Sequence, residues 1–365
     1  NVYFANILSS IYLPRNRSHF SRKVIQILDE YWSAINSSLV NGKLNEIKIE
    51  CIAELKSVSP DELLAAAEER LNNSNDNDTD LSEEAFRKAE YDAILMQAGG
   101  PKQDFYAHKI EASAYSSTIN KYFKSIYLLY KIKETRAFTG FSRWLPDNDG
   151  HYSDRKKDLY LDEEINWLPA ITVRGEGIFF EFDHTGIQEW SNRREVINRA
   201  DILMKNYNKS LFARGRSDRI LNPRFILIHT FAHMLINQFS FYCGYGSSAL
   251  RERIYCNTEN LSEIMNGVLI YTASGDSEGT LGGLVRQGKP GCLEDIVTSA
   301  IAHSNWCSSD PVCMESMGQG PASCNLAACH SCALLPETSC EEGNRLLDRG
   351  LVTGTLDIRN TGYFL

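Results

Sequence analysis

The spacing of apolar and polar positions along this chain predicts several helices. "SPDELLAAAEERL" (59–71) begins with Ser59, a good N-cap residue, and continues with proline and two acids, as a helix start does. Segments 81–100 and 292–307 also repeat apolar residues with a helical period. Segment 222–244, "NPRFILIHTFAHMLINQFSFYCG", is apolar on all sides, so we expect it to form a long buried helix.

Segments rich in β-branched and aromatic residues predict strands between these helices. The run from Ile126 to Ile132 favours a strand, and "GVLIYTAS" (267–274) favours a buried one. "LPAITVRGEGIFFEF" (168–182) predicts a hairpin whose turn lies at 174–177. Because helices and strands mix without a regular βαβ repeat, the sequence predicts an α+β fold of mixed helices and short sheets, with a cysteine-rich domain at its C-terminal end.

The length and the changes in composition along the chain predict two parts. We expect residues 1–215 to form a helical and mixed region, with an acidic helical arm at about 59–100 and a basic, aromatic stretch at 102–144. Residues 216–365 would form the second part. The arm carries most of the net charge of −9, because residues 61–92 hold eleven acids and three bases.

The overall composition is that of a globular protein. The chain has 365 residues, of which 43% are hydrophobic, and it contains no apolar run of eighteen residues that would suggest a membrane span. The N-terminus has no initiator methionine, so we expect that this sequence begins partway along a longer chain. It has no secretory pattern, so we expect the protein in the cytoplasm. In that reducing compartment, clustered cysteines indicate a metal or catalysis rather than disulfides.

Cysteines are concentrated near the C-terminal end. Six of the ten lie within 34 residues: Cys307, Cys313, Cys324, Cys329, Cys332 and Cys340. Cys329 and Cys332 form a C-x-x-C knuckle, a spacing that lets two thiolates reach one ion from a tight turn. A redox pair is the alternative, but no thioredoxin-like strand and helix pattern surrounds the motif.

A structural zinc ion held by thiolates is therefore expected. We predict Cys329, Cys332, Cys340 and Cys313 as its ligands, with Cys307 or Cys324 as the alternative fourth ligand. A site closed by four thiolates has no open position, so it would stabilise the fold and would not hydrolyse a substrate.

A second group of polar residues lies in the long apolar helix. His229 and His233 stand one helical turn apart, but Thr230 occupies the place where an H-E-x-x-H metalloprotease has its general base. We expect these histidines to be core residues, with a second metal or a partner contact as alternatives. One alternative function is a nuclease or other hydrolase that uses His229, His233 and the Gly-rich segment around Asp276 and Ser277. The other alternative is a purely structural interaction protein without DNA contact.

Two basic stretches suggest contact with nucleic acid. Residues 193–224 hold nine bases and three acids, and residues 102–143 hold eight bases and three acids. In the second stretch, bases alternate with aromatic residues, which is typical of single-strand binding but also of a half-buried sheet with aromatics in its core. Our candidates for phosphate contacts are Arg214, Arg216, Arg219, Arg136 and Arg143.

Several motifs together resemble a known family. "FILIHTFAHMLI", "GVLIYTASGDSEGTLGGLV", "CSSDPVC" and "NLAACHSCALLPETSCEEGNRLLDR" occur in this order within about residues 222–350. They are similar to the MrfA-like zinc-binding domain, which is found at the C-terminal end of certain superfamily 2 helicases and in stand-alone helicase partners. Within that family, the motifs are most similar to the helicase-associated subunits of DISARM anti-phage defence systems.

The resemblance implies a subunit without a motor of its own. It would bind Zn²⁺, associate with a DrmA-like superfamily 2 helicase and help that helicase to engage DNA with a single-stranded part, away from membranes. The sequence agrees in one respect, because its 365 residues contain no G-x-x-x-x-G-K-[ST] phosphate loop. We therefore expect no enzymatic activity of this chain itself.

Overall fold

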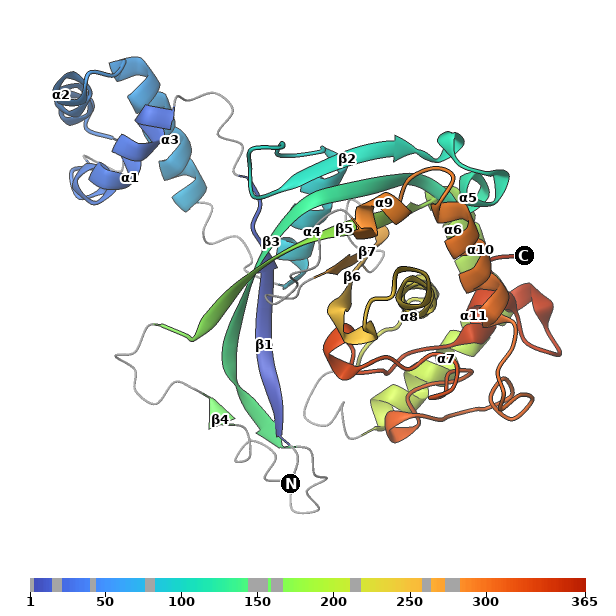
Figure 1. The fold of residues 1–365 in the computed structure, drawn as a ribbon. Helices are drawn as coiled ribbons and strands as arrows, with labels where there is room; N and C mark the ends of the chain where they lie inside the picture. The colour runs from blue at the N-terminus through green and yellow to red at the C-terminus, as the bar shows by residue number, and fades with distance from the viewer. Residues whose placement is uncertain are drawn as a thin grey trace. The chain divides into compact units, whose positions relative to one another are not determined.

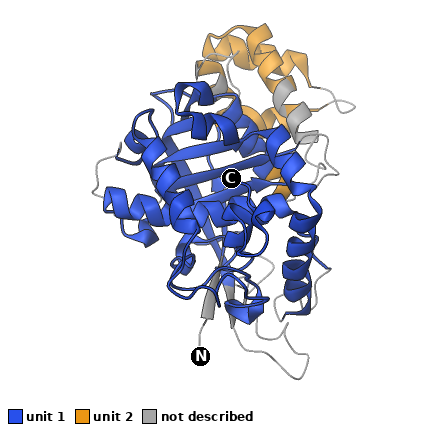
Figure 2. Ribbon diagram, turned by 90° about the vertical axis from the view of Figure 1, so that its right-hand side faces the viewer, with its two compact units in different colours: residues 1–13, 87–365 blue, residues 14–86 orange. Residues whose placement is uncertain are grey.

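The computed structural model describes residues 3–14, 22–39, 44–75, 83–143, 157–158, 167–210, 218–257, 264–272 and 283–365. The chain divides into two compact units (Figure 2). Unit 1 combines residues 1–13 with 87–365, and unit 2 is residues 14–86. The expected boundary at residue 215 lies inside unit 1.

Unit 2 is a small cluster of helices. Its helices are α1 (Arg22–Asn36), α2 (Glu46–Lys56) and α3 (Pro60–Asn75). Ile27, Ile52 and Leu63 bring one side chain from each helix into a shared apolar core. Helix α3 confirms the helix expected at 59–71. Helix α4 (Glu83–Leu95) confirms the helix expected within 81–100, and from residue 87 onward it belongs to unit 1.

Unit 1 is built on one antiparallel sheet. The described residues contribute seven strands: β1 (Tyr3–Ile11), β2 (Tyr106–Glu111), β3 (Phe123–Arg143), β4 (Lys157–Asp158), β5 (Ala170–Phe182), β6 (Leu250–Cys256) and β7 (Asn266–Thr272). Their order is β1-β3-β5-β7-β6, and β2 and β4 also pair with β3. The α+β class is confirmed, although a single curved sheet replaces the short sheets expected from the sequence.

The hairpin expected at 168–182 is wrong. Strand β5 runs through both glycines without turning, and it pairs with β3 on one side and β7 on the other. The glycines instead allow the neighbouring strand β7 to approach closely, since a Cβ at Gly175 would lie 1.7 Å from the carbonyl oxygen of Thr272. A glycine in a strand therefore marked tight packing against a neighbour and not a turn.

Helices cover both faces of this sheet. Besides α4, unit 1 has α5 (Ser117–Tyr122), α6 (His184–Ser191), α7 (Arg194–Lys209), α8 (Pro223–Cys243), α9 (Gly283–Gln287), α10 (Leu293–Ser304) and α11 (Arg349–Thr353). Figure 1 shows α8 nearly end-on, with β6 and β7 on one side of it and α10 and α11 on the other. The helices expected at 222–244 and 292–307 are confirmed as α8 and α10, and the described residues of the segment 267–274 form the expected buried strand, β7. None of the described helices is both long and apolar enough to cross a membrane.

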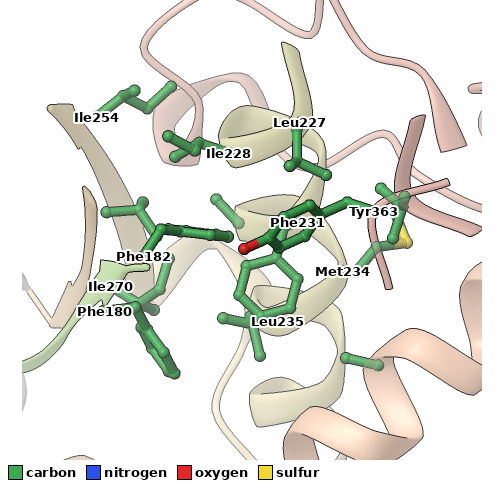
Figure 3. Packing of buried hydrophobic residues seen from close by; sticks show 14 of the residues in the cluster. Phe180, Phe182, Leu227, Ile228, Phe231, Met234, Leu235, Ile254, Ile270 and Tyr363 are labelled. Atoms are coloured by element: carbon green, nitrogen blue, oxygen red, sulfur yellow. The ribbon is translucent and has the colours of Figure 1, made fainter. Parts of the chain in front are cut away.

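The strands alternate their side chains between two cores. Ile126 and Leu128 of β3 face the core around α8, whereas Tyr127 and Leu129 face the core that α4 covers. On the α8 side, Phe231 meets Phe182 edge to face, with ring centroids 5.7 Å apart (Figure 3). Because α8 contacts the sheet and several helices at once, it is apolar around its whole circumference, as the sequence indicated.

Candidate metal centre

Four cysteine sulfurs converge in the C-terminal part of unit 1. Sγ atoms of Cys307 and Cys329 lie 3.5 Å apart, those of Cys329 and Cys332 lie 3.7 Å apart, and those of Cys313 and Cys332 lie 3.9 Å apart. All four sulfurs lie within 4.8 Å of one another. Tetrahedral Zn–S bonds of about 2.3 Å separate thiolate sulfurs by about 3.8 Å. The group therefore fits one zinc ion, which these four cysteines would hold.

Two short turns position the sulfurs. Cys307 follows the end of α10, and its N–H donates to Asp310 Oδ2 at 2.8 Å, which closes the turn towards Cys313. In the second turn, the N–H of Cys329 donates to Cys332 Sγ at 3.3 Å. Amide N–H groups that point at sulfur stabilise the thiolate form that a metal requires.

A buried arginine supports the same group. Arg349, fully buried at the start of α11, donates to Asp310 Oδ1 at 2.9 Å and lies 3.6 Å from Cys313 Sγ. The positive guanidinium of Arg349 favours the thiolate form of Cys313. Four thiolates around a divalent ion carry two excess negative charges, and Arg349 offsets part of that charge.

Replacing Arg349 with methionine is expected to weaken zinc binding by about 10–100-fold, because supporting residues of a metal site typically contribute that much to affinity. A chelator competition assay on the purified chain measures this effect. Arg286→Met, at an exposed position of α9, is the matched control and should leave affinity as it is. Unchanged affinity in the Arg349 variant would contradict a supporting role for its guanidinium.

The structure brings together some of the predicted ligands. Cys329, Cys332 and Cys313 lie in one group, and Cys307, predicted as an alternative, is its fourth member. Cys340 is not in this group, and its sulfur lies instead 3.2 Å from His229 Nε2. Cys324 packs in the apolar core around α8.

The loop after the knuckle explains where Cys340 lies. Ser339 Oγ donates to the carbonyl oxygen of Ser247, and the N–H of Glu341 donates to Glu252 Oε1 at 3.1 Å. These bonds hold Cys340 against β6 and α8, so closeness in sequence did not indicate closeness in space. The useful signal was the pairing of two short motifs, "CSSDPVC" and "CHSC", each of which supplies two sulfurs.

The arginines predicted for nucleic acid lie in different environments. Arg219 donates to both carboxylate oxygens of Glu342, at 2.9 and 2.7 Å, and Arg136 donates twice to Glu134 Oε2. Their guanidinium groups are thus engaged within the protein. Arg214 and Arg216 lie outside the described residues, as does the side chain of Arg143.

The basic, aromatic stretch contributes mainly to the sheet. Tyr122, Phe123 and Tyr127 are buried in the two cores. Lys124 donates to Glu181 at 2.8 Å, and Lys133 donates to Asp104 at 2.9 Å. The interpretation of a half-buried sheet with aromatics in its core is confirmed for these residues.

The residues of the alternative hydrolase are only partly described. His229 and His233 are fully buried, and Thr230 Oγ1 donates to the carbonyl oxygen of Ile226 at 2.7 Å within α8. Asp276 and Ser277 lie outside the described residues.

Four thiolates around one position in an α+β fold define a zinc-binding domain. Residues 231–333 match the family model of the MrfA Zn-binding domain. The matched range includes all four grouped cysteines and ends before Cys340. Over 380 aligned residues, the chain is also 34% identical to the DISARM protein DrmB of Bacillus paralicheniformis. That alignment covers all of this chain and 64% of the relative, and it confirms the resemblance seen in the motifs.

Proposed function

We propose that this chain is a non-motor part of a DISARM-type anti-phage defence complex, in the cytoplasm. The observation that carries the proposal is the 34% identity to the DISARM protein DrmB along the whole chain. The metal centre supports a structural role, because four thiolates fill a tetrahedral shell and leave no position for a substrate or an activated water.

The proposed partner is a superfamily 2 helicase of the DrmA type. The 365 residues contain no phosphate loop, so ATP hydrolysis would come from the partner. Trp306 and Val312, each next to a zinc ligand, are 70% and 78% exposed. Large exposed apolar side chains favour protein contacts, and a bound ion would fix the turn that presents them. We therefore place the proposed helicase contact on this turn, residues 305–313.

The proposed DNA contact uses basic residues near α7. Arg194, Lys205 and Lys209 are exposed on this helix, and Arg214 and Arg216 follow it in the sequence. Bases that are free of internal partners neutralise phosphates and release counterions. Arg219 and Arg136 are weaker candidates for phosphate contacts, because their guanidinium groups already pair with the carboxylates of Glu342 and Glu134.

Two measurements test this function. Co-expression with a DrmA-type helicase should recover both chains together, and Trp306→Ala should weaken recovery, whereas Phe241→Ala, exposed at the end of α8, should not. Recovery of no helicase with the wild-type chain would contradict the proposal.

Binding of labelled single-stranded DNA should weaken steeply with salt. Arg214→Gln with Arg216→Gln should reduce the slope of log K against log salt by about 0.7 per lost phosphate contact. The matched control is Arg286→Gln at an exposed position of α9. Binding that does not depend on salt would contradict the proposed DNA contact. No binding, either with or without the helicase, would also contradict it, and the chain would then be a purely structural interaction protein.

A further inference from the structure

A second group of ligand-type side chains lies apart from the four cysteines. His229 and His233 of α8, Glu252 of β6 and Cys340 of the C-terminal loop each direct one donor atom to a common position, all within 4.8 Å of one another. All four side chains are buried. The group joins three segments that are distant in sequence.

The distances within this group match a coordination shell. His229 Nε2 lies 3.2 Å from Cys340 Sγ and 3.1 Å from Glu252 Oε1, and His233 Nε2 lies 3.6 Å from the same Oε1. With metal bonds of about 2.0–2.3 Å, a tetrahedral zinc site separates such N, O and S donors by about 3.3–3.6 Å.

Hydrogen bonds orient the ligands from outside. His233 Nδ1 lies 2.7 Å from the carbonyl oxygen of Ala333 and must donate to it, so Nε2 carries the lone pair in the neutral imidazole. Metal-binding histidines are usually held in this way. The N–H of Asn344 donates to Cys340 Sγ at 3.2 Å, and the N–H of Glu341 donates to Glu252 Oε1.

Hydrogen bonds among the described residues satisfy only part of this group. His233 Nε2 and Glu252 Oε2 are buried without a hydrogen-bond partner among the described residues. When His233 is neutral, the lone pair on its Nε2 faces the Glu252 carboxylate, and two such acceptors repel each other unless a proton or a metal cation lies between them. Burial makes this repulsion costly, because water cannot reduce it.

Charge also favours a divalent ion at this position. Glu252 and Cys340 as carboxylate and thiolate contribute two negative charges, and the two neutral imidazoles contribute none. A divalent cation would give a neutral buried complex, which needs no nearby arginine of the kind that Arg349 provides at the four-cysteine group. Imidazole, carboxylate and thiolate together suit zinc.

We propose that His229, His233, Glu252 and Cys340 bind a second divalent transition metal ion, zinc in the first instance, in a closed structural site. The site cross-links α8, β6 and the C-terminal loop. His233 also connects it to the four-cysteine group, because its hydrogen-bond acceptor Ala333 directly follows Cys332.

Metal counting tests this proposal. Elemental analysis of the purified chain should give two metal ions per molecule. Cys340→Ser should reduce the count to one, whereas Cys324→Ser, at a buried cysteine outside both groups, should keep it at two. One ion in the wild-type protein, or two in the Cys340→Ser variant, would overturn the proposal.

X-ray absorption of the wild-type zinc protein gives an answer that does not depend on any variant folding. Two sites would surround two zinc ions with five sulfurs and three nitrogen or oxygen atoms, whereas the four-cysteine site by itself would show sulfur only. A spectrum with sulfur neighbours only would exclude the second site. Neither experiment uses DNA or the helicase, so each outcome is independent of the proposed function.

Discussion

Changing Cys329 and Cys332 together to serine is expected to abolish zinc binding at the four-cysteine group and to unfold the segment around it. Between the end of α10 at Ser304 and the start of α11 at Arg349, the chain forms turns, short 3-10 helices and one isolated β-bridge, but no α-helix and no strand. Structural zinc contributes an apparent binding free energy of about 10–16 kcal/mol. Typical domains are stable by only about 5–15 kcal/mol, so this segment cannot keep its fold without the ion.

Zinc content, limited proteolysis and thermal unfolding together measure this effect. We expect the double variant to lose the zinc of this site and to be cleaved within residues 305–348. The matched control changes Cys243 and Cys324 to serine, since neither sulfur belongs to a ligand group. If the double variant kept its full zinc content and its resistance to protease, the assignment of these four cysteines as ligands would be wrong.

The second large effect is expected at a buried ion pair on the opposite face of the sheet. Arg253 of β6 donates to both carboxylate oxygens of Glu90 of α4, at 2.6 and 2.7 Å, and both side chains are buried. Glu90 also accepts hydrogen bonds from the N–H of Ile11 and from Tyr255 OH. The carboxylate therefore joins α4, β6 and the end of β1.

Glu90→Ala should destabilise unit 1 by about 3–5 kcal/mol, because it leaves the Arg253 guanidinium buried without its counter-ion. Chemical denaturation, followed by tryptophan fluorescence, measures the free energy of unfolding. Replacing both partners, with Glu90→Leu and Arg253→Met, should cost less than the sum of the single changes, since no charge then remains buried.

Asp92→Asn on the same helix is the matched control. Asp92 pairs with Lys88 one turn away, and both side chains are partly exposed to solvent. Such a surface pair is worth about 0–1 kcal/mol. Equal losses of stability in the Glu90 and Asp92 variants would contradict the importance of burial for the Glu90–Arg253 pair.

Local patterns in the sequence were sufficient to predict most helices and the class of the metal site. Helix α8 was predictable because Pro223 and Gly244 mark its ends and its residues are apolar on every side. The C-x-x-C spacing of Cys329 and Cys332 indicated zinc, because neighbouring residues in a turn keep their distance in any fold. Both signals depend only on residues that are close in sequence.

Pairing between distant segments was decided by the tertiary structure. Two glycines suggested a turn at 174–177, but β5 continues through them and pairs with β7. Position 175 is a glycine because the β7 backbone approaches it too closely for a side chain. Likewise, Cys340 follows the knuckle by only a few residues, yet a hydrogen bond from the Glu341 N–H to the Glu252 side chain of β6 holds this loop beside His229. The sequence by itself thus determined the helices, the α+β class and the presence of a thiolate metal site. Only the packing of distant strands and loops decided which sulfurs meet, because ligand geometry depends on contacts that no local spacing encodes.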